Sequence, residues 1–181
     1  LLRLKHPSMF SIKSCPLPDE ALLGSYVHAG AYTDCYQADQ PGTVTQAQYV
    51  NAFYTTWVFK LERAILKWAV ARPSLDSEAK QLAQGEIDNF AAWHVESRCD
   101  NQLLLSDFRG HTRSWLMTLP AGDANEAKTR LYFGSAVVPA QDPRSGETRL
   151  GLVFGALLGF HKIYSRILLH SARARLKRRL L

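Results

Sequence analysis

The hydrophobic pattern of this 181-residue chain changes its period near Phe90, and this change constrains the fold more than any other feature. From Phe90 onward, apolar and polar residues alternate with the two-residue period of half-buried strands. The pairs Asp100-Asn101 and Arg109-Gly110 fit tight hairpin turns, so the first three strands are expected to form an antiparallel meander. The alternation predicts four strands, over residues 90–98, 102–108, 111–119 and 129–138.

Helical spacing is found on both sides of these strands. The clearest helix begins with a capping-box pattern, Thr45 with Gln48, and is expected to continue to Val70. The last helix is expected from about Leu150 to Arg179. Three shorter elements complete the plan: a helix over 19–30, a strand over 31–38 and a helix over 76–84. Helices segregated from an antiparallel sheet predict the α+β class.

A single domain accounts for this pattern. Prolines at positions 7, 16 and 18 predict an irregular N-terminal arm over residues 1–18. Residues 19–181 are expected to form one domain whose C-terminal helix has a basic end. A chain of this length buries about 70% of the surface that it exposes when unfolded, so it can hold a core without disulfides or metals.

Basic residues concentrate at the C-terminal end. The net charge is +6, and residues 148–181 hold eight basic and no acidic side chains, whereas the rest hold 14 basic and 16 acidic ones. Because the basicity is not spread over the domain, a specific nucleic-acid surface is not expected. Five side chains form a stripe on the last helix: Lys162, Arg166, His170, Arg173 and Lys177. The stripe is either a solvated helix end or a contact with anionic lipid or RNA. Residues 173–181 are expected to lie beyond the apolar face.

The three cysteines, Cys15, Cys35 and Cys99, are widely separated and form no C-x-x-C motif. Neither a disulfide framework nor a metal site is therefore expected, and no cofactor motif such as Walker A or G-x-G-x-x-G is present. The chain has no apolar run of 18 residues and no secretion-type apolar stretch near its start. Together with the cysteine pattern, these features favour a cytoplasmic protein.

Four stretches resemble a known group of proteins: residues 30–35 (GAYTDC), 52–63 (AFYTTWVFKLER), 102–107 (QLLLSD) and 159–166 (GFHKIYSR). They are similar to a bacterial family of small proteins without an assigned activity. That family lies near the START-like, Bet v 1-like superfamily, which includes polyketide cyclases. The order of elements resembles the helix-grip fold of the superfamily. The resemblance implies a curved antiparallel sheet of six or seven strands wrapped around the C-terminal helix, whereas the sequence pattern predicts only five strands, the four alternating ones and the strand over 31–38.

The resemblance also implies a cavity between sheet and helix, in which members of the superfamily bind lipids, sterols or polyketides. His161 lies on the apolar side of the last helix beside Tyr164, where it is either a cavity group or a buried structural histidine. Gly155 belongs to a ridge with Gly151 and Gly159 that leaves space for another backbone or a ligand. The remaining candidates are two aromatic residues and one cation. Trp57 and Trp115 belong either to the core or to the wall of the pocket, and Arg113 either binds a ligand carboxylate or lies on a solvated face of the sheet.

The leading hypothesis is a protein that binds an apolar or amphipathic small molecule in this cavity; the sequence favours a binding protein over an enzyme but leaves enzymatic activity open. One alternative is an enzyme of the cyclase, dehydratase or isomerase type, in which His161 acts with a carboxylate such as Asp107. Another alternative is a module that docks its basic C-terminal helix on a membrane or an acidic partner. The sequence does not predict an oligomeric state.

Overall fold

The computed structural model describes residues 12–60, 75–123, 126–138 and 152–179, and for residues 152–161 and 179 it describes the backbone alone. The fold is α+β, as the sequence predicts. The strands are β1 (Lys13–Ser14), β2 (Tyr32–Pro41), β3 (Asn89–Phe90), β4 (Trp93–Cys99), β5 (Gln102–Asp107), β6 (Thr112–Pro120) and β7 (Lys128–Val137). The helices are α1 (Gly24–His28), α2 (Gln46–Tyr54), α4 (Asp76–Gln84) and α5 (Leu152–Arg179).

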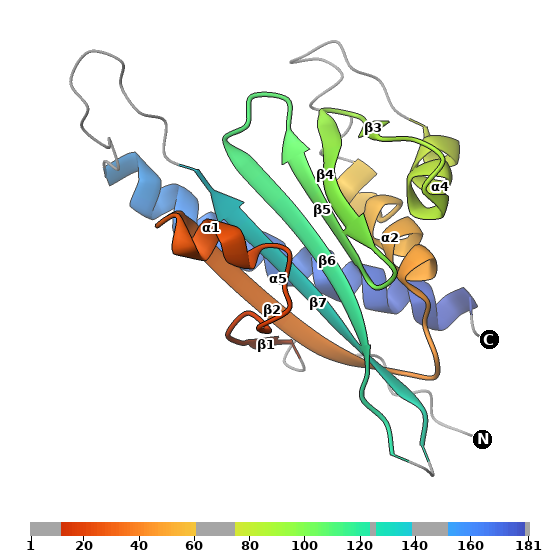
Figure 1. Cartoon of the computed structure of the whole chain (residues 1–181). Helices are drawn as coiled ribbons and strands as arrows, with labels where there is room; N and C mark the ends of the chain where they lie inside the picture. Colours follow the sequence, from red (N-terminus) through yellow and green to blue (C-terminus); the bar gives the residue numbers. More distant parts are fainter. Residues whose placement is uncertain (1–11, 61–74, 124–125, 139–151, 180–181) are drawn as a thin grey trace.

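The seven strands of the described residues form one antiparallel sheet in the order β1-β2-β7-β6-β5-β4-β3. The predicted meander is confirmed, and β2 joins it by pairing along its whole length with β7. Helices α2 and α5 lie behind the sheet in Figure 1, whereas α1 lies in front of it. The main core fills the space between the sheet and α2, α4 and α5, and a smaller core lies under α1 and the N-terminal arm.

The predicted strand over residues 90–98 is wrong in one respect, because the chain reverses after Phe90. Phe90 pairs with Trp93, so β3 and β4 form a hairpin around Ala91 and Ala92. Ala91 adopts a φ of 52°, a left-handed conformation that no glycine or asparagine signals in the sequence. The burial of Phe90, which is 2% exposed, offsets this local strain. The two strands beyond the five predicted ones are β3 and β1, the latter lying inside the arm expected to be irregular.

The predicted long helix from Thr45 to Val70 is interrupted at Thr55 and Thr56. The capping box at Thr45 is present as expected, but α2 ends at Tyr54. The Thr55 hydroxyl donates to the carbonyl of Asn51. The Thr56 hydroxyl donates to the carbonyl of Phe53 and accepts from the N–H of Phe59, so it caps a new helical turn. Threonine hydroxyls compete with the helix backbone in this way. The part of the prediction that falls on residues 61–70 lies outside the described residues.

The C-terminal end of α5 packs into the main core, contrary to the expectation that residues 173–181 lie beyond its apolar face. Leu176 is 3% exposed, and the buried Arg173 donates from a guanidinium nitrogen to the backbone oxygen of Asp39. Burial and the nearby charge of Arg173 also lower the pKa of His170. Within the basic stripe, Lys162 and Arg166 are therefore exposed, whereas the side chains from His170 onward are half-buried or buried. The stripe is not a uniformly solvated face. Of the described helices, none has both the length and the apolar character to cross a membrane.

Candidate functional site

A pocket of about 520 Å³ lies where the N-terminal arm, the edge of β2 and helix α5 meet. It forms because β1 covers only part of the β2 edge. The last ladder contact is the N–H of Cys15 donating to the carbonyl of Cys35 at 3.0 Å. Farther along, Tyr32 to Asp34 pair with β7 on one side and with no strand of the described chain on the other. The volume lies in the range of about 300–1,000 Å³ that is usual for small-molecule sites.

Strand β2 contributes three polar side chains to one wall. Tyr32, Asp34 and Tyr36 are two residues apart, so they share the face of the strand that looks toward α5. The Ser135 hydroxyl, directly opposite in the β2–β7 register, donates to the Asp34 carboxylate. This hydrogen bond orients Asp34 within the wall.

The polar row continues from Asp34 into the protein interior. Ser114 lies opposite Ser135 in the β6–β7 register, and its hydroxyl is 3.0 Å from the hydroxyl of Tyr54 on α2. Both serines and Tyr54 are buried. The row thus links the pocket wall to the helix layer through buried hydrogen-bonding groups, which fix its position.

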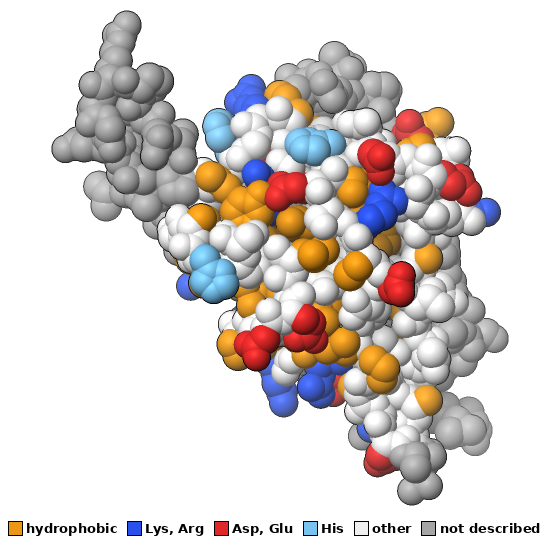
Figure 2. Space-filling view, viewed as in Figure 1, with side chains coloured by type: hydrophobic (Ala, Val, Ile, Leu, Met, Phe, Trp, Pro, Cys, Tyr) orange, Lys and Arg blue, Asp and Glu red, His pale blue; other side chains and the backbone are white. Residues whose placement is uncertain are grey.

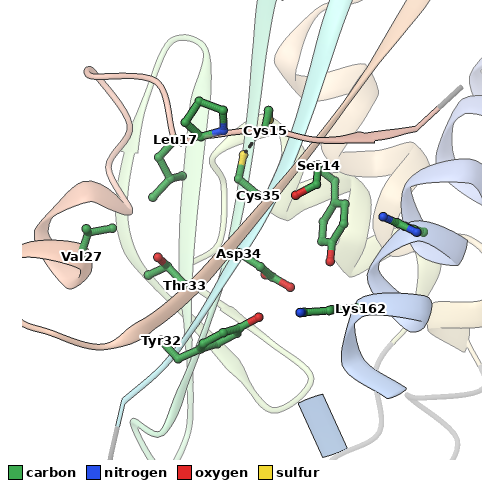
Figure 3. Close-up of a pocket in the computed structure, with 12 residues that line it drawn as sticks. Ser14, Cys15, Leu17, Val27, Tyr32, Thr33, Asp34, Cys35 and Lys162 are labelled. Carbon is green, nitrogen blue, oxygen red and sulfur yellow. Dashed lines mark hydrogen bonds between the residues drawn. The ribbon is translucent and has the colours of Figure 1, made fainter. Parts of the chain in front are cut away.

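Helix α5 contributes two cations to the opposite wall. Lys162 and Arg166 are four residues apart, so they lie on the same side of the helix. Figure 3 shows the Asp34 carboxylate and the Tyr32 hydroxyl pointing toward Lys162. The Arg166 guanidinium lies 5.5 Å from the centre of the Tyr36 ring, a cation–π contact. With two cations and one carboxylate, the formal charge of the pocket is +1.

Both tyrosines keep their protons over the physiological range. Burial, with the charge of Asp34, raises the pKa of Tyr32 above its ordinary value. The same two causes, in the same order, raise the pKa of Tyr36 to about 12, although Arg166 acts in the opposite direction. The two phenols therefore serve as neutral hydrogen-bond donors and acceptors.

The rest of the lining is more apolar and comes from the arm and α1. Pro16, Leu17 and Val27 contribute aliphatic surface, and Val27 is 47% exposed at the rim. Cys15 and Cys35 lie side by side under this part, with their sulfur atoms 3.4 Å apart (Figure 3). The pocket thus has a charged end against α5 and an apolar end against the arm.

Among the described side chains, none of the sequence-predicted site residues lines this pocket. Trp57 is 70% exposed, because the interruption at Thr55 and Thr56 changes the helical register. Tyr164 is half-buried against the main core. Gly155 and His161 belong to α5, but their side chains lie outside the described part of the chain.

Two other candidates, Trp115 and Arg113, lie on the face of the sheet opposite α5, so the structure does not bring them to a cavity beside that helix. Trp115 is fully buried in the smaller core. Arg113 forms an ion pair with Glu96, 2.6 Å from Nε to Oε2, and donates to the hydroxyl of Tyr26 on α1. Glu96 is the extra residue of a β-bulge in β4. The bulge turns its carboxylate toward Arg113 and Tyr26. Figure 2 shows this face, where charged side chains of both signs are scattered among hydrophobic ones.

Asp107, the carboxylate suggested for catalysis, holds the turn between β5 and β6. Its oxygens accept from the N–H groups of Arg109 and Thr112. This is the ordinary structural role of an aspartate at a tight turn. In the described part of the chain, no three His, Cys, Asp or Glu side chains are grouped so that they could hold a metal ion.

The sequence signal for the pocket residues is divided between two distant segments of the chain. Tyr32, Asp34 and Tyr36 alternate along a predicted strand, and Lys162 and Arg166 begin the basic stripe. The sequence does not show that this strand lies at a partly open edge beside the last helix, because that depends on long-range strand order.

Comparisons with protein-family models, curated proteins and solved structures find no match to this chain, so the pocket's own chemistry is the guide to its function.

Proposed function

We propose that this protein binds a small amphipathic molecule with an anionic head group in the pocket between β2 and α5. The head group, a carboxylate or a phosphate, contacts Lys162 and Arg166, and the apolar part extends toward Leu17 and Val27. The observation that carries the proposal is the pair of cations facing Asp34 and the tyrosines across a hollow of about 520 Å³.

The charge balance supports an anionic head over a cationic one. The Asp34 carboxylate already accepts a hydrogen bond from the Ser135 hydroxyl within the wall, and the two cations of the lining outnumber it. Lys162 and Arg166 are exposed and lie at the mouth, and the guanidinium can bind two oxygens of a carboxylate or phosphate at once. The neutral hydroxyl of Tyr32 adds a hydrogen-bond donor beside them.

We further propose that the sheet and α5 form a START-like helix grip. Support comes from the long C-terminal helix, which packs against β2 and α2 on one face of an antiparallel sheet. The pocket opens between the same helix and the same sheet, which is where ligands of that superfamily bind. The proposed site lies at the β2 edge and not over the centre of the sheet, where aromatic side chains such as Phe53 and Phe133 fill the space.

Native mass spectrometry of freshly purified protein tests whether a small molecule co-purifies. The head-group preference is tested with two probes of equal chain length, dodecanoic acid and dodecanol, by calorimetric titration. We expect the acid to bind more tightly. Replacing either cation by alanine should weaken acid binding by about tenfold, which corresponds to about 1.4 kcal/mol for one charge-assisted contact at a partly exposed site.

The matched control is Arg178→Ala, which removes an exposed cation from the same helix outside the pocket lining. It should leave the affinity for both probes unchanged. Lys162→Ala and Arg166→Ala should likewise leave the affinity for dodecanol unchanged. If the acid and the alcohol bind equally well, and Lys162→Ala with Arg166→Ala affects neither, the pocket is not the proposed anion site.

A further inference from the structure

Cys15 and Cys35 are far apart in the sequence but directly opposite each other in the sheet. The N–H of Cys15 donates to the carbonyl of Cys35, which extends the β1–β2 register by one pair beyond Ser14 and Tyr36. Directly opposed residues of this kind have Cα atoms about 5.5 Å apart. Disulfides span Cα distances of about 4.4–6.8 Å, so the backbone already has the spacing that a disulfide needs.

The side chains point toward each other as well. The two sulfur atoms are 3.4 Å apart and in hydrogen-bonding contact. A disulfide bond of about 2.05 Å requires the sulfurs to approach by roughly 1.4 Å, which rotation about the two Cα–Cβ bonds can supply. Cys15 is half-buried and Cys35 is 3% exposed, so a reagent that enters the pocket reaches Cys15 first.

The local electrostatics give the two thiols different roles. The hydrogen bond with Cys35, together with the charge of Arg130, lowers the pKa of Cys15 despite partial burial. The neighbouring thiol and burial raise the pKa of Cys35. Because the thiolate is the nucleophile in thiol–disulfide exchange, Cys15 is suited to attack and Cys35 to resolve the product.

We propose that Cys15 and Cys35 form a reversible redox site, which closes to a disulfide with a small-molecule disulfide such as oxidised glutathione as the oxidant. The Cys15 thiolate attacks one sulfur of the oxidant, which forms a mixed disulfide and releases one glutathione thiolate. Cys35 then loses its proton to solvent and attacks the Cys15 sulfur, which releases the second glutathione thiolate. Two protein thiols are oxidised, and one glutathione disulfide is reduced to two molecules of glutathione.

The inference does not depend on the ligand proposed above, because the site consists of the protein's own sulfur atoms. Its physical effect is to fasten the N-terminal arm to β2 by a covalent link between residues 20 positions apart. Closing a loop of this size raises the unfolding temperature of a chain of this length by about 6–12 °C.

The test uses the full chain with Cys99→Ser, which removes the exposed third thiol and with it intermolecular pairing. After reduction, the protein is incubated with glutathione disulfide and analysed by intact mass and by peptide mapping without reduction. We expect a loss of the mass of two hydrogen atoms, a linkage of the Cys15 and Cys35 peptides, a higher unfolding temperature, and full reversal by dithiothreitol.

Cys15→Ser in the same background is the matched control, since it should leave Cys35 unmodified by glutathione disulfide. Two results would overturn the proposal. One is that both thiols persist in the folded protein while the same chain oxidises in denaturant. The other is a glutathione adduct on Cys15 that Cys35 does not displace.

Discussion

Gly134 in β7 occupies a place in the sheet where no larger residue fits, and alanine at this position should destabilise the protein. Gly134 pairs with Cys35 on one side and Trp115 on the other. A Cβ atom added there would lie 2.9 Å from the Trp115 ring, 3.0 Å from the backbone oxygen of Asp34 and 3.0 Å from a methyl group of Leu23. Favourable carbon contacts begin at about 3.5 Å, so these neighbours must move by roughly half an ångström.

The neighbours of Gly134 cannot move independently. Trp115 and Leu23 are fully buried, and the oxygen of Asp34 belongs to the backbone of the paired strand. Overpacking a well-filled core costs about 1–3 kcal/mol, against which alanine gains about 0.5–1 kcal/mol from a less flexible unfolded chain. A net loss near 1–2 kcal/mol corresponds to a fall of about 2–8 °C in the unfolding temperature of a protein of this size.

Differential scanning calorimetry of Gly134→Ala measures this change. The matched control is Gly24→Ala, because an added Cβ at Gly24 meets nothing within 4 Å and the residue begins helix α1. We expect the control to unfold at or slightly above the temperature of the parent protein. If Gly134→Ala is as stable as the parent, the close packing of β7 against Trp115 and β2 is not the reason for glycine at this position.

Three further changes test other parts of the structure. Arg113→Met should lower the free energy of unfolding by about 1 kcal/mol, since it removes an ion pair between the largely buried Arg113 side chain and the exposed Glu96. It should leave dodecanoic acid binding unchanged, because Arg113 lies on the opposite face of the sheet. Weakened binding would contradict this placement. Leu176→Ala should lower the free energy of unfolding, measured by chemical denaturation, by about 2–5 kcal/mol, because Leu176 is buried. A decrease below about 0.5 kcal/mol is typical of a surface residue and would show that this end of α5 is not packed. Tyr36→Phe should reduce the loss of folding stability at alkaline pH. Folding raises the pKa of Tyr36 from 10.0 to about 12, so the stability that Tyr36 contributes is complete below pH 10.0 and is lost as the pH rises to about 12. An unchanged stability profile in pH-dependent denaturation would show that Tyr36 is not the source of this loss.

Local patterns in the sequence predict most of the helices and strands. The short helix over residues 76–84 is found with the expected bounds and ends at Gly85, whose φ is 77°. The strands that become β5, β6 and β7 are within one residue of their predicted ends. These elements are predictable because alternation, capping residues and glycine at a helix end act over a few neighbouring residues.

The errors arise where local and long-range forces compete. At Ala91 the chain adopts a left-handed turn that its sequence does not favour, because burial of Phe90 outweighs the local cost. At Thr55 and Thr56 two hydroxyl groups end a helix whose apolar spacing continues beyond them. Periodicity alone does not distinguish a continuous helix from two helices with a break.

The candidate site was less predictable than the fold, because it depends on which strand lies at the edge. The sequence places Trp115 and Arg113 on a strand but does not show which face of the sheet meets α5. Asp34 and Lys162 are 128 positions apart in the chain. Only the pairing of β2 with β7, and the path of α5 beside β2, bring them to the same pocket.

The pairing of β2 with β7 also has a consequence for how the chain folds during synthesis. Asp34 and Ser135, which face each other in this pair, are 101 residues apart. At a synthesis rate of roughly 5–20 residues per second, β2 waits about 5–20 s for its partner to leave the ribosome. The hairpins from β4 to β7 close over short loops, so we expect them to form before β2 pairs with β7, which carries a higher entropic cost of loop closure. A nascent chain that ends before Lys128 therefore exposes the edge of β2 that later pairs with β7, and this interval is when the protein is most open to chaperones and to aggregation.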